Sequence, residues 1–114
     1  MMLERTSQLF GNRNRTMVLI AVRVLAETYP SELGALLGLR LFAVQRLLES
    51  FERDGIIVSR SVGRTRVVAL NPRFFASKEL SALLWAMAKQ DPELVSKLAL
   101  KRRRPRRPGK PGLP

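Results

Sequence analysis

Residues 31–72, SELGALLGLRLFAVQRLLESFERDGIIVSRSVGRTRVVALNP, decide how this chain folds. In the first part of this stretch, apolar residues recur at helical spacing on either side of Gly38. The pattern predicts a short helix capped by Ser31, a tight turn at Gly38, and a longer helix over about 40–53. Gly55 suits the position that follows a helix C-terminus. A short helix, a glycine turn and a longer helix are the order of a helix-turn-helix motif.

The apolar pattern changes its period after this motif. Residues 56–60 and 66–70 are rich in β-branched side chains and have the length of strands, and the segment 61–65 between them contains the turn residue Gly63. We therefore expect a two-stranded hairpin. It contains no acidic residue, which favours contact with phosphate over a merely solvated turn. Its basic residues are Arg60, Arg64 and Arg66.

Helices are also predicted on both sides of this stretch. Apolar residues recur at helical spacing from about Arg15 to Tyr29, where Pro30 ends the helix. A further helix is predicted from Ser77 to Lys89, followed by a short amphipathic turn. The fold class is therefore mainly α with a small β-hairpin. The chain divides into a lead-in segment (1–14), a helix-turn-helix and hairpin domain (15–72), a C-terminal helical segment (73–100) and a basic tail (101–114).

The chain is strongly basic. Its 114 residues carry 21 Lys and Arg against 9 Asp and Glu, a formal net charge of +12. Residues 1–100 contain 14 of these cations and all 9 acids, so this part alone carries +5. Such a field attracts polyanions, nucleic acid before an anionic membrane. The tail, in which Arg and Lys alternate with Pro and Gly, is expected to be disordered, either as a non-specific DNA clamp or as a plain charged terminus.

The sequence contains no cysteine and no histidine. Their absence excludes disulfides and the usual ligands of zinc, copper and iron, and it removes the commonest general base. Asp91 and Glu93 flank Pro92, where helix capping explains them better than a catalytic carboxylate pair. We therefore expect a protein that is not an enzyme and uses no metal and no cofactor.

The most apolar run of the sequence, residues 17–25, is interrupted by Arg23. It is shorter than the about 20 residues that span a bilayer, and no signal-peptide cleavage site follows it. The expectation is a cytoplasmic, nucleoid-associated protein without a membrane partner.

The stretch from Leu9 to about Met87 resembles bacterial winged helix-turn-helix regulators of the ArsR-like type. The resemblance rests on LFGNRNRTMVLIAVRVLAETYP, SELGALLGLRLFAVQRLLESFERDGII and VSRSVGRTRVVALNP, in the order of that fold. It implies that the third helix enters the major groove of double-stranded DNA and that the hairpin, or wing, touches the backbone or minor groove. The DNA-binding residues it implies are Arg40, Leu41, Phe42, Gln45 and Arg46 on the helix and Arg60, Arg64 and Arg66 on the wing.

The chemistry of these side chains suggests which part of the DNA each of them would contact. Gln45 suits adenine edges, Arg46 suits guanine edges, and Arg40 is better placed for phosphate. The sequence departs from the family pattern at residues 41–43, where small polar residues are usual. Leu41 and Phe42 could meet thymine methyl groups, the core or a partner. The metal-binding Cys and His of metal-sensing members are also missing, which argues against a metal effector.

The helix expected at 77–89 carries an apolar stripe that fits either the core or a dimer seam. The resemblance implies a homodimer formed through terminal helices, and aromatic residues and Met are enriched in interfaces. The predicted interface residues are Leu80, Leu83, Leu84, Trp85 and Met87. On the third helix, Glu49 is expected to form helical salt pairs with Arg46 or Arg53.

Three functions remain open at this point. The first is a sequence-specific DNA-binding transcription regulator, most plausibly a repressor. The second is an architectural or partition protein that coats DNA with little sequence choice, which the basic tail favours. The third is a protein-interaction module anchored by Leu41 and Phe42. RNA binding is weaker, because no aromatic stacking platform is visible on the strands.

Overall fold

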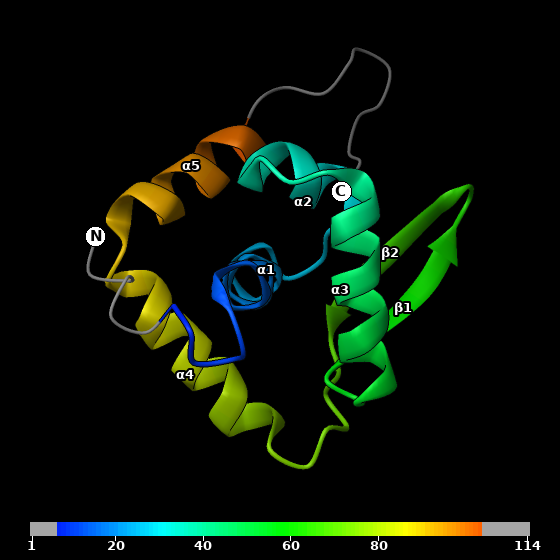
Figure 1. Ribbon diagram of the computed structural model, residues 1–114, viewed down its shortest axis with the longest axis horizontal. Helices are drawn as coiled ribbons and strands as arrows, with labels where there is room; N and C mark the ends of the chain where they lie inside the picture. Colours follow the sequence, from blue (N-terminus) through cyan, green and yellow to red (C-terminus); the bar gives the residue numbers. More distant parts are fainter. Residues whose placement is uncertain (1–6, 104–114) are drawn as a thin grey trace.

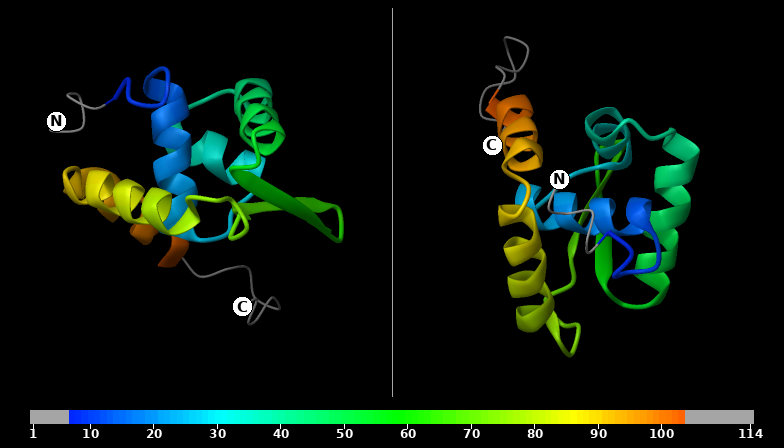
Figure 2. Two further views of the ribbon diagram at one scale, coloured as in Figure 1. Left: turned by 90° about the horizontal axis from the view of Figure 1, so that it is seen from below. Right: turned by 60° about the vertical axis from the view of Figure 1, so that its left-hand side comes forward.

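The computed structural model describes residues 7–103. The first six residues of the predicted lead-in segment and residues 104–114 of the predicted tail lie outside this range. The fold class predicted from the sequence is confirmed: the described chain is mainly α with one antiparallel hairpin in winged-helix order (Figures 1 and 2). Its elements are α1 (Arg13–Leu25), α2 (Pro30–Leu37), α3 (Leu41–Arg53), β1 (Ile57–Val62), β2 (Thr65–Leu70), α4 (Ser77–Lys89) and α5 (Pro92–Arg103).

Helix α1 is the centre of the fold, and Figure 1 shows α2, α3, α4 and α5 arranged around it. Its middle turns, residues 18–22, are completely buried. Asn12 caps its N-terminus, because the Asn12 Oδ1 accepts a hydrogen bond from the Arg15 N–H at 2.9 Å. The helix ends earlier than predicted, because Ala26 takes a positive φ of 70° and stops the helical hydrogen bonding. Thr28, expected inside the helix, instead forms an antiparallel bridge with Val68 of β2.

The helix-turn-helix motif is present between α2 and α3. Pro30 is the first residue of α2, which suits a residue without an N–H. Tyr29 therefore occupies the N-cap, and the predicted cap at Ser31 is wrong. Gly38 ends α2, as predicted, and the structure places it in the left-handed conformation. The turn is so tight that a Cβ on Gly34 would lie 2.9 Å from the carbonyl oxygen of Leu39.

The hairpin is longer and its turn shorter than the sequence suggested. The strands pair from Ile57 opposite Leu70 to Val62 opposite Thr65, which leaves two turn residues in place of the predicted five. The first of these, Gly63, has a φ of 64°, while Arg64 keeps a negative φ. A positive φ at the first position alone is typical of a type II′ turn, whose twist matches that of the strands. The hairpin is thus a regular ribbon up to its tip.

The C-terminal part packs two helices on α1. Helix α4 spans Ser77–Lys89 as predicted, whereas α5 continues to Arg103, well past the short turn that was expected. Asp91 is buried and caps α5, because its Oδ1 accepts a hydrogen bond from the Leu94 N–H at 3.2 Å. This confirms capping as the role of that carboxylate. In the described part of the chain, no helix is long and apolar enough to cross a membrane.

Candidate nucleic-acid interface

Helix α3 and the hairpin lie together on one side of the molecule, and α4 and α5 lie on the other (Figure 1). The inner face of α3 is fixed to the core by Val44, Leu48 and Phe51, all of them buried. Its opposite face is therefore turned to solvent. All the residues that the sequence assigned to this face are exposed: Arg40, Leu41, Phe42, Gln45, Arg46 and Glu49. We call this set together with the hairpin the α3–wing surface.

Two large apolar side chains stand at the start of this surface. Leu41 is 47% exposed and Phe42 is 67% exposed, so neither belongs to the core of the described chain. The guanidinium of Arg46 lies over the Phe42 ring, 5.6 Å from its centroid. Such a contact restrains the arginine while leaving its hydrogen-bond donors in the plane of the guanidinium free. The α3 face thus offers an apolar group and a cation side by side.

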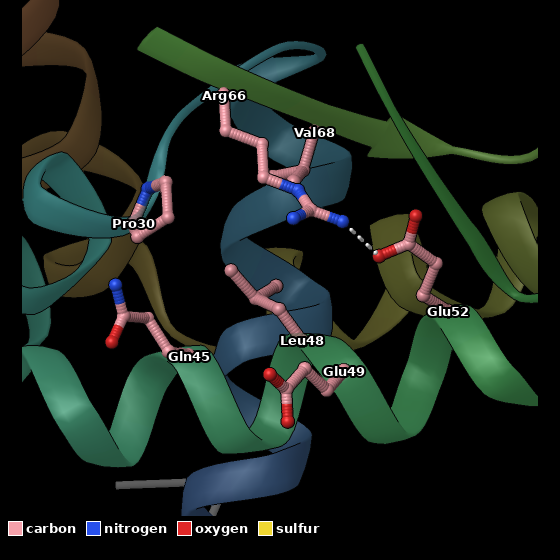
Figure 3. Close-up of a pocket in the computed structure, with 7 residues that line it drawn as sticks. All are labelled: Pro30, Gln45, Leu48, Glu49, Glu52, Arg66 and Val68. Atoms are coloured by element: carbon pink, nitrogen blue, oxygen red, sulfur yellow. Dashed lines mark hydrogen bonds and ion pairs between the residues drawn. The ribbon is translucent and has the colours of Figure 1, made fainter. Parts of the chain in front are cut away.

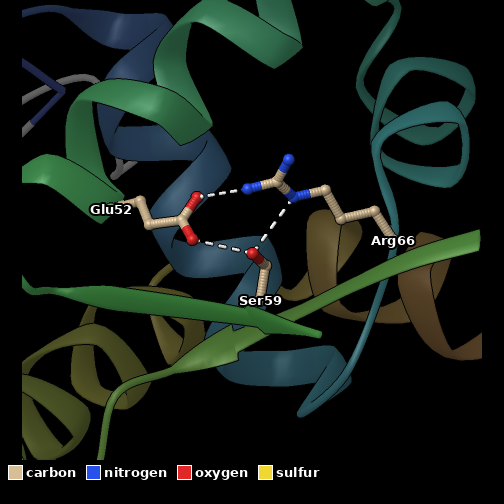
Figure 4. A network of polar contacts seen from close by, with 3 residues as sticks. All are labelled: Glu52, Ser59 and Arg66. Carbon is tan, nitrogen blue, oxygen red and sulfur yellow. Dashed lines mark hydrogen bonds and ion pairs between the residues drawn. The ribbon is translucent and has the colours of Figure 1, made fainter. Parts of the chain in front are cut away.

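A polar network ties the wing to α3 (Figure 4). Arg66 of β2 donates from Nη2 to Oε1 of Glu52 at 2.9 Å and from Nε to the Ser59 hydroxyl at 3.0 Å. The Ser59 hydroxyl in turn donates to Oε2 of Glu52 at 2.7 Å. Both oxygens of the carboxylate are therefore used, and the cation of Arg66 is already balanced by an acid of the same chain.

The three wing arginines differ in their surroundings. Arg60 donates to Glu27, from the loop before α2, at 2.9 Å. Arg66 is paired with Glu52. Arg64 stands at the exposed tip and has no ion pair among residues 7–103. Although the hairpin itself carries no acid, as the sequence showed, acids from two other elements neutralise two of its three cations. Sequence reasoning missed Glu27, Glu52 and Ser59, because no local spacing links them to the hairpin.

The salt pairs expected for Glu49 are not formed. Within the part of the chain that the structure describes, no salt bridge joins Glu49 to Arg46 or Arg53. The acid of α3 that does pair is Glu52, which lies closer to the wing. Glu49 instead leaves a negative charge on the exposed α3 face, beside the positive charge of Arg46.

A cavity of about 270 Å³ separates the middle of α3 from β2 (Figure 3). In this view Gln45 and Glu49 rise from α3 on one side, and Arg66 reaches across the other side to Glu52. The cavity is therefore lined by side chains of both charges. Two of them, Glu52 and Arg66, also belong to the polar network that ties the wing to α3. The lining residues of the cavity are Pro30, Gln45, Leu48, Glu49, Glu52, Arg66 and Val68.

The residues predicted for a dimer seam divide into two groups. Leu84 and Met87 are buried within the chain, where they belong to the common core. They have almost no surface left to give to a partner, so their assignment to an interface is corrected to core. Leu83 and Trp85 are exposed, and Leu80 is half-buried. Arg23 of α1 covers one face of Trp85, with its guanidinium 5.0 Å from the ring centroid.

The side chains of the α3–wing surface are suited to binding another molecule through hydrogen bonds, charge and apolar contact. Within residues 7–103, no cluster of three metal-ligating residues occurs. The surface offers a glutamine, arginines and two apolar side chains, which are groups suited to base edges, phosphates and thymine methyl groups.

The chain matches no protein-family model and no curated protein sequence. Among solved structures, it is similar to the crystal structure of the reduced form of MarR from E. coli. The two share 23% identity, the TM-score is 0.59, and the match covers 88% of this chain and 72% of that chain. This similarity shows a winged-helix fold over most of the described residues.

Proposed function

We propose that this chain is a DNA-binding transcription regulator of the winged-helix type that reads double-stranded DNA with its α3–wing surface. The observation that carries the proposal is the placement of the exposed α3 face and the arginine-bearing wing on one side of the fold. The basic charge of the chain and the similarity in fold to MarR, a winged-helix transcription regulator, support it. In this role α3 enters the major groove, and the wing follows the neighbouring phosphates.

The surroundings of each side chain refine its proposed role. Gln45 and Arg46 are exposed and long enough to contact base edges, and Phe42 beside Arg46 suits a thymine methyl group. Arg40, at the N-cap of α3, is placed for phosphate. On the wing, Arg64 is the cation that can bind phosphate without first leaving an acid, so we assign it the main wing contact.

We further propose a homodimer in which α4 faces a second copy through Leu83, Trp85 and the half-buried Leu80. Two recognition helices related by twofold symmetry would then reach half-sites about one helical turn apart, roughly 34 Å along DNA. The ArsR-like character, the action as a repressor and the cytoplasmic, nucleoid-associated location belong to this same proposal. No effector metal and no catalytic role form part of it.

Duplex binding measured over a salt series tests the proposal. Fluorescence anisotropy with a labelled random duplex should show affinity that falls steeply between about 50 and 200 mM salt, since each phosphate contact adds about 0.9 to the log–log slope. Selection from a random pool of duplexes should then enrich one DNA sequence. The Gln45→Ala variant should enrich a different sequence, and the Arg64→Ala variant should enrich the same one. Failure of the full chain to bind any duplex at low salt would remove the proposal.

The exposed Leu41 and Phe42 favour two alternatives, a surface that docks a partner protein and a surface that coats DNA without sequence choice. A chain shortened after Arg103, where α5 ends, separates these possibilities. Sequence-selective binding by the shortened chain supports the regulator. Non-selective binding that disappears with the tail supports a coating protein, and absence of binding in both forms supports a protein-docking module.

A further inference from the structure

Arg23 is a half-buried cation on α1. It lies in the last turn of α1, where its Nε donates to the carbonyl oxygen of Ser81 at 3.1 Å and its guanidinium packs on Trp85. Among residues 7–103, no carboxylate forms a salt bridge with it. Taking a charge partly out of water is costly unless an opposite charge compensates for it. The terminal nitrogens of Arg23 therefore remain available for an anion.

Arg23 lines an open groove of about 470 Å³ between α1, the end of β2 and the first turns of α4. The groove contains a second cation, Lys78, and no acidic residue. Two of its polar side chains are already used, because Asn71 donates to the Gly55 carbonyl and Ser77 donates to the Pro72 carbonyl. The rest of the lining consists of Ser81, whose carbonyl oxygen accepts from Arg23, and three apolar residues, Leu70, Pro72 and Ala82. The full lining is Arg23, Leu70, Asn71, Pro72, Ser77, Lys78, Ser81 and Ala82.

We propose that this groove binds a small organic carboxylate with an apolar body. The carboxylate would pair with the guanidinium of Arg23, a geometry that arginine forms with two parallel hydrogen bonds, and Lys78 would add a second charge. The apolar body would lie on Leu70, Pro72 and Ala82. A largely apolar concavity of a few hundred Å³ with a few polar groups is the usual form of a small-molecule site. The groove shares no lining residue with the α3–wing cavity, so the inference stands apart from DNA binding.

Trp85 reports on this groove, because it contacts Arg23 and is the single tryptophan of the chain. We would titrate the full chain with hexanoate, acetate and hexan-1-ol at constant ionic strength and follow the Trp85 emission. Hexanoate should give a saturable change with half-saturation at least about tenfold below that of acetate, and hexan-1-ol should give none. Equal half-saturation for acetate and hexanoate, or an equal response to the alcohol, would overturn the proposal.

Two variants locate the binding. Arg23→Gln should raise the half-saturation for hexanoate by about tenfold or more, as expected for loss of a charged hydrogen-bonded pair. Because Arg23 also contacts Trp85, a second variant avoids it: Ala82→Glu places a carboxylate in the groove, and Ala99→Glu places the same group on an exposed position of α5. Only Ala82→Glu should abolish the response and the rise in Tm that hexanoate gives. Identical titrations of these two variants would refute the site, even if Arg23→Gln did not fold.

Discussion

The Arg66 guanidinium lies 2.9 Å from the Glu52 carboxylate and fixes the second strand of the hairpin to α3 (Figure 4). The contact joins the two elements that form the proposed DNA-binding surface, and Ser59 closes the network from β1. The side chain of Arg66 is nevertheless well exposed. Solvent weakens exposed ion pairs, so we assign this one a role in orienting the wing more than in stabilising the fold.

Arg64 and Arg66 should therefore contribute differently to DNA binding. Arg64→Ala should lower the magnitude of the log–log salt slope by about 0.9, because one phosphate contact is lost. Arg66→Ala should change the slope clearly less, since its charge is already balanced by Glu52. Anisotropy titrations at four or more salt concentrations measure both slopes. The matched variant Glu52→Gln should make Arg66 available and steepen the slope. Equal losses from the two arginine variants would contradict this division.

Gly34 should be required for the helix-turn-helix turn. An alanine in the middle of a helix usually stabilises it relative to glycine, but here the added Cβ would meet the Leu39 carbonyl oxygen at 2.9 Å. We expect Gly34→Ala to lower the free energy of unfolding by about 1 to 3 kcal/mol, measured by urea denaturation.

Gly38 provides the control for this prediction. Its φ is 70°, and nothing lies within 4 Å of an added Cβ, so only backbone strain opposes a side chain. Gly38→Ala should cost about 1 to 2 kcal/mol, and Gly38→Asn should recover part of it, because asparagine tolerates the left-handed region. Substitution of Gly34 by asparagine should bring no such recovery. Recovery at both positions would show that strain, not contact, limits Gly34.

The main elements could be predicted from the sequence because their signals are local. Apolar spacing, the glycines at 38 and 55 and the change to β-branched runs lie within the elements that they define. The structure differs from the prediction where contacts between residues far apart in the sequence determine the local conformation or the pairing of a side chain. The bridge from Thr28 to Val68 takes Thr28 out of the helix that its neighbours favour, and the pairing of Glu27 with Arg60 spans 33 positions. No pattern within the hairpin could indicate either contact.

The same reasoning explains the corrected interface residues. A helical stripe shows which residues share a face, but it does not show whether the core or a partner covers that face. Leu84 and Met87 pack into the core, whereas Leu83 and Trp85 on the same helix stay exposed. Only the packing of α4 on α1 and α5 separates these two groups.

Phe42 should matter for binding and not for folding. Because its ring is 67% exposed, Phe42→Ala should change the free energy of unfolding by no more than about 0.5 kcal/mol. If it meets a base, duplex affinity should fall about fivefold, equal to about 1 kcal/mol. Phe75, a highly exposed phenylalanine outside the α3–wing surface, supplies the control, and Phe75→Ala should leave affinity unchanged. Equal effects of the two variants on DNA affinity would argue against a contact by Phe42.

Asp91 should be needed for its acceptor oxygen and not for its charge. Oδ1 caps α5, while Oδ2 is buried and has no hydrogen-bond partner within the described chain. Asp91→Ala should cost about 1 kcal/mol of stability through loss of the cap. Asp91→Asn keeps an acceptor oxygen and removes the charge from a buried position, so it should be at least as stable as the original chain. Urea denaturation of the three proteins at neutral pH tests this order, and an asparagine variant as unstable as the alanine variant would show that the charge is required.

Leu83 should control self-association without affecting the fold. It is 42% exposed on α4, so Leu83→Lys should change the free energy of unfolding of the protomer by no more than about 0.5 kcal/mol. If α4 forms the dimer, burying the lysine charge against the partner should shift the chain to monomer, which sedimentation equilibrium measures directly. Val58 on the hairpin is exposed to a similar extent, 40%, and Val58→Lys should leave the dimer intact. A dimer that survives Leu83→Lys but dissociates in Val58→Lys would move the interface to the wing side of the molecule, where it would compete with the proposed contact to DNA.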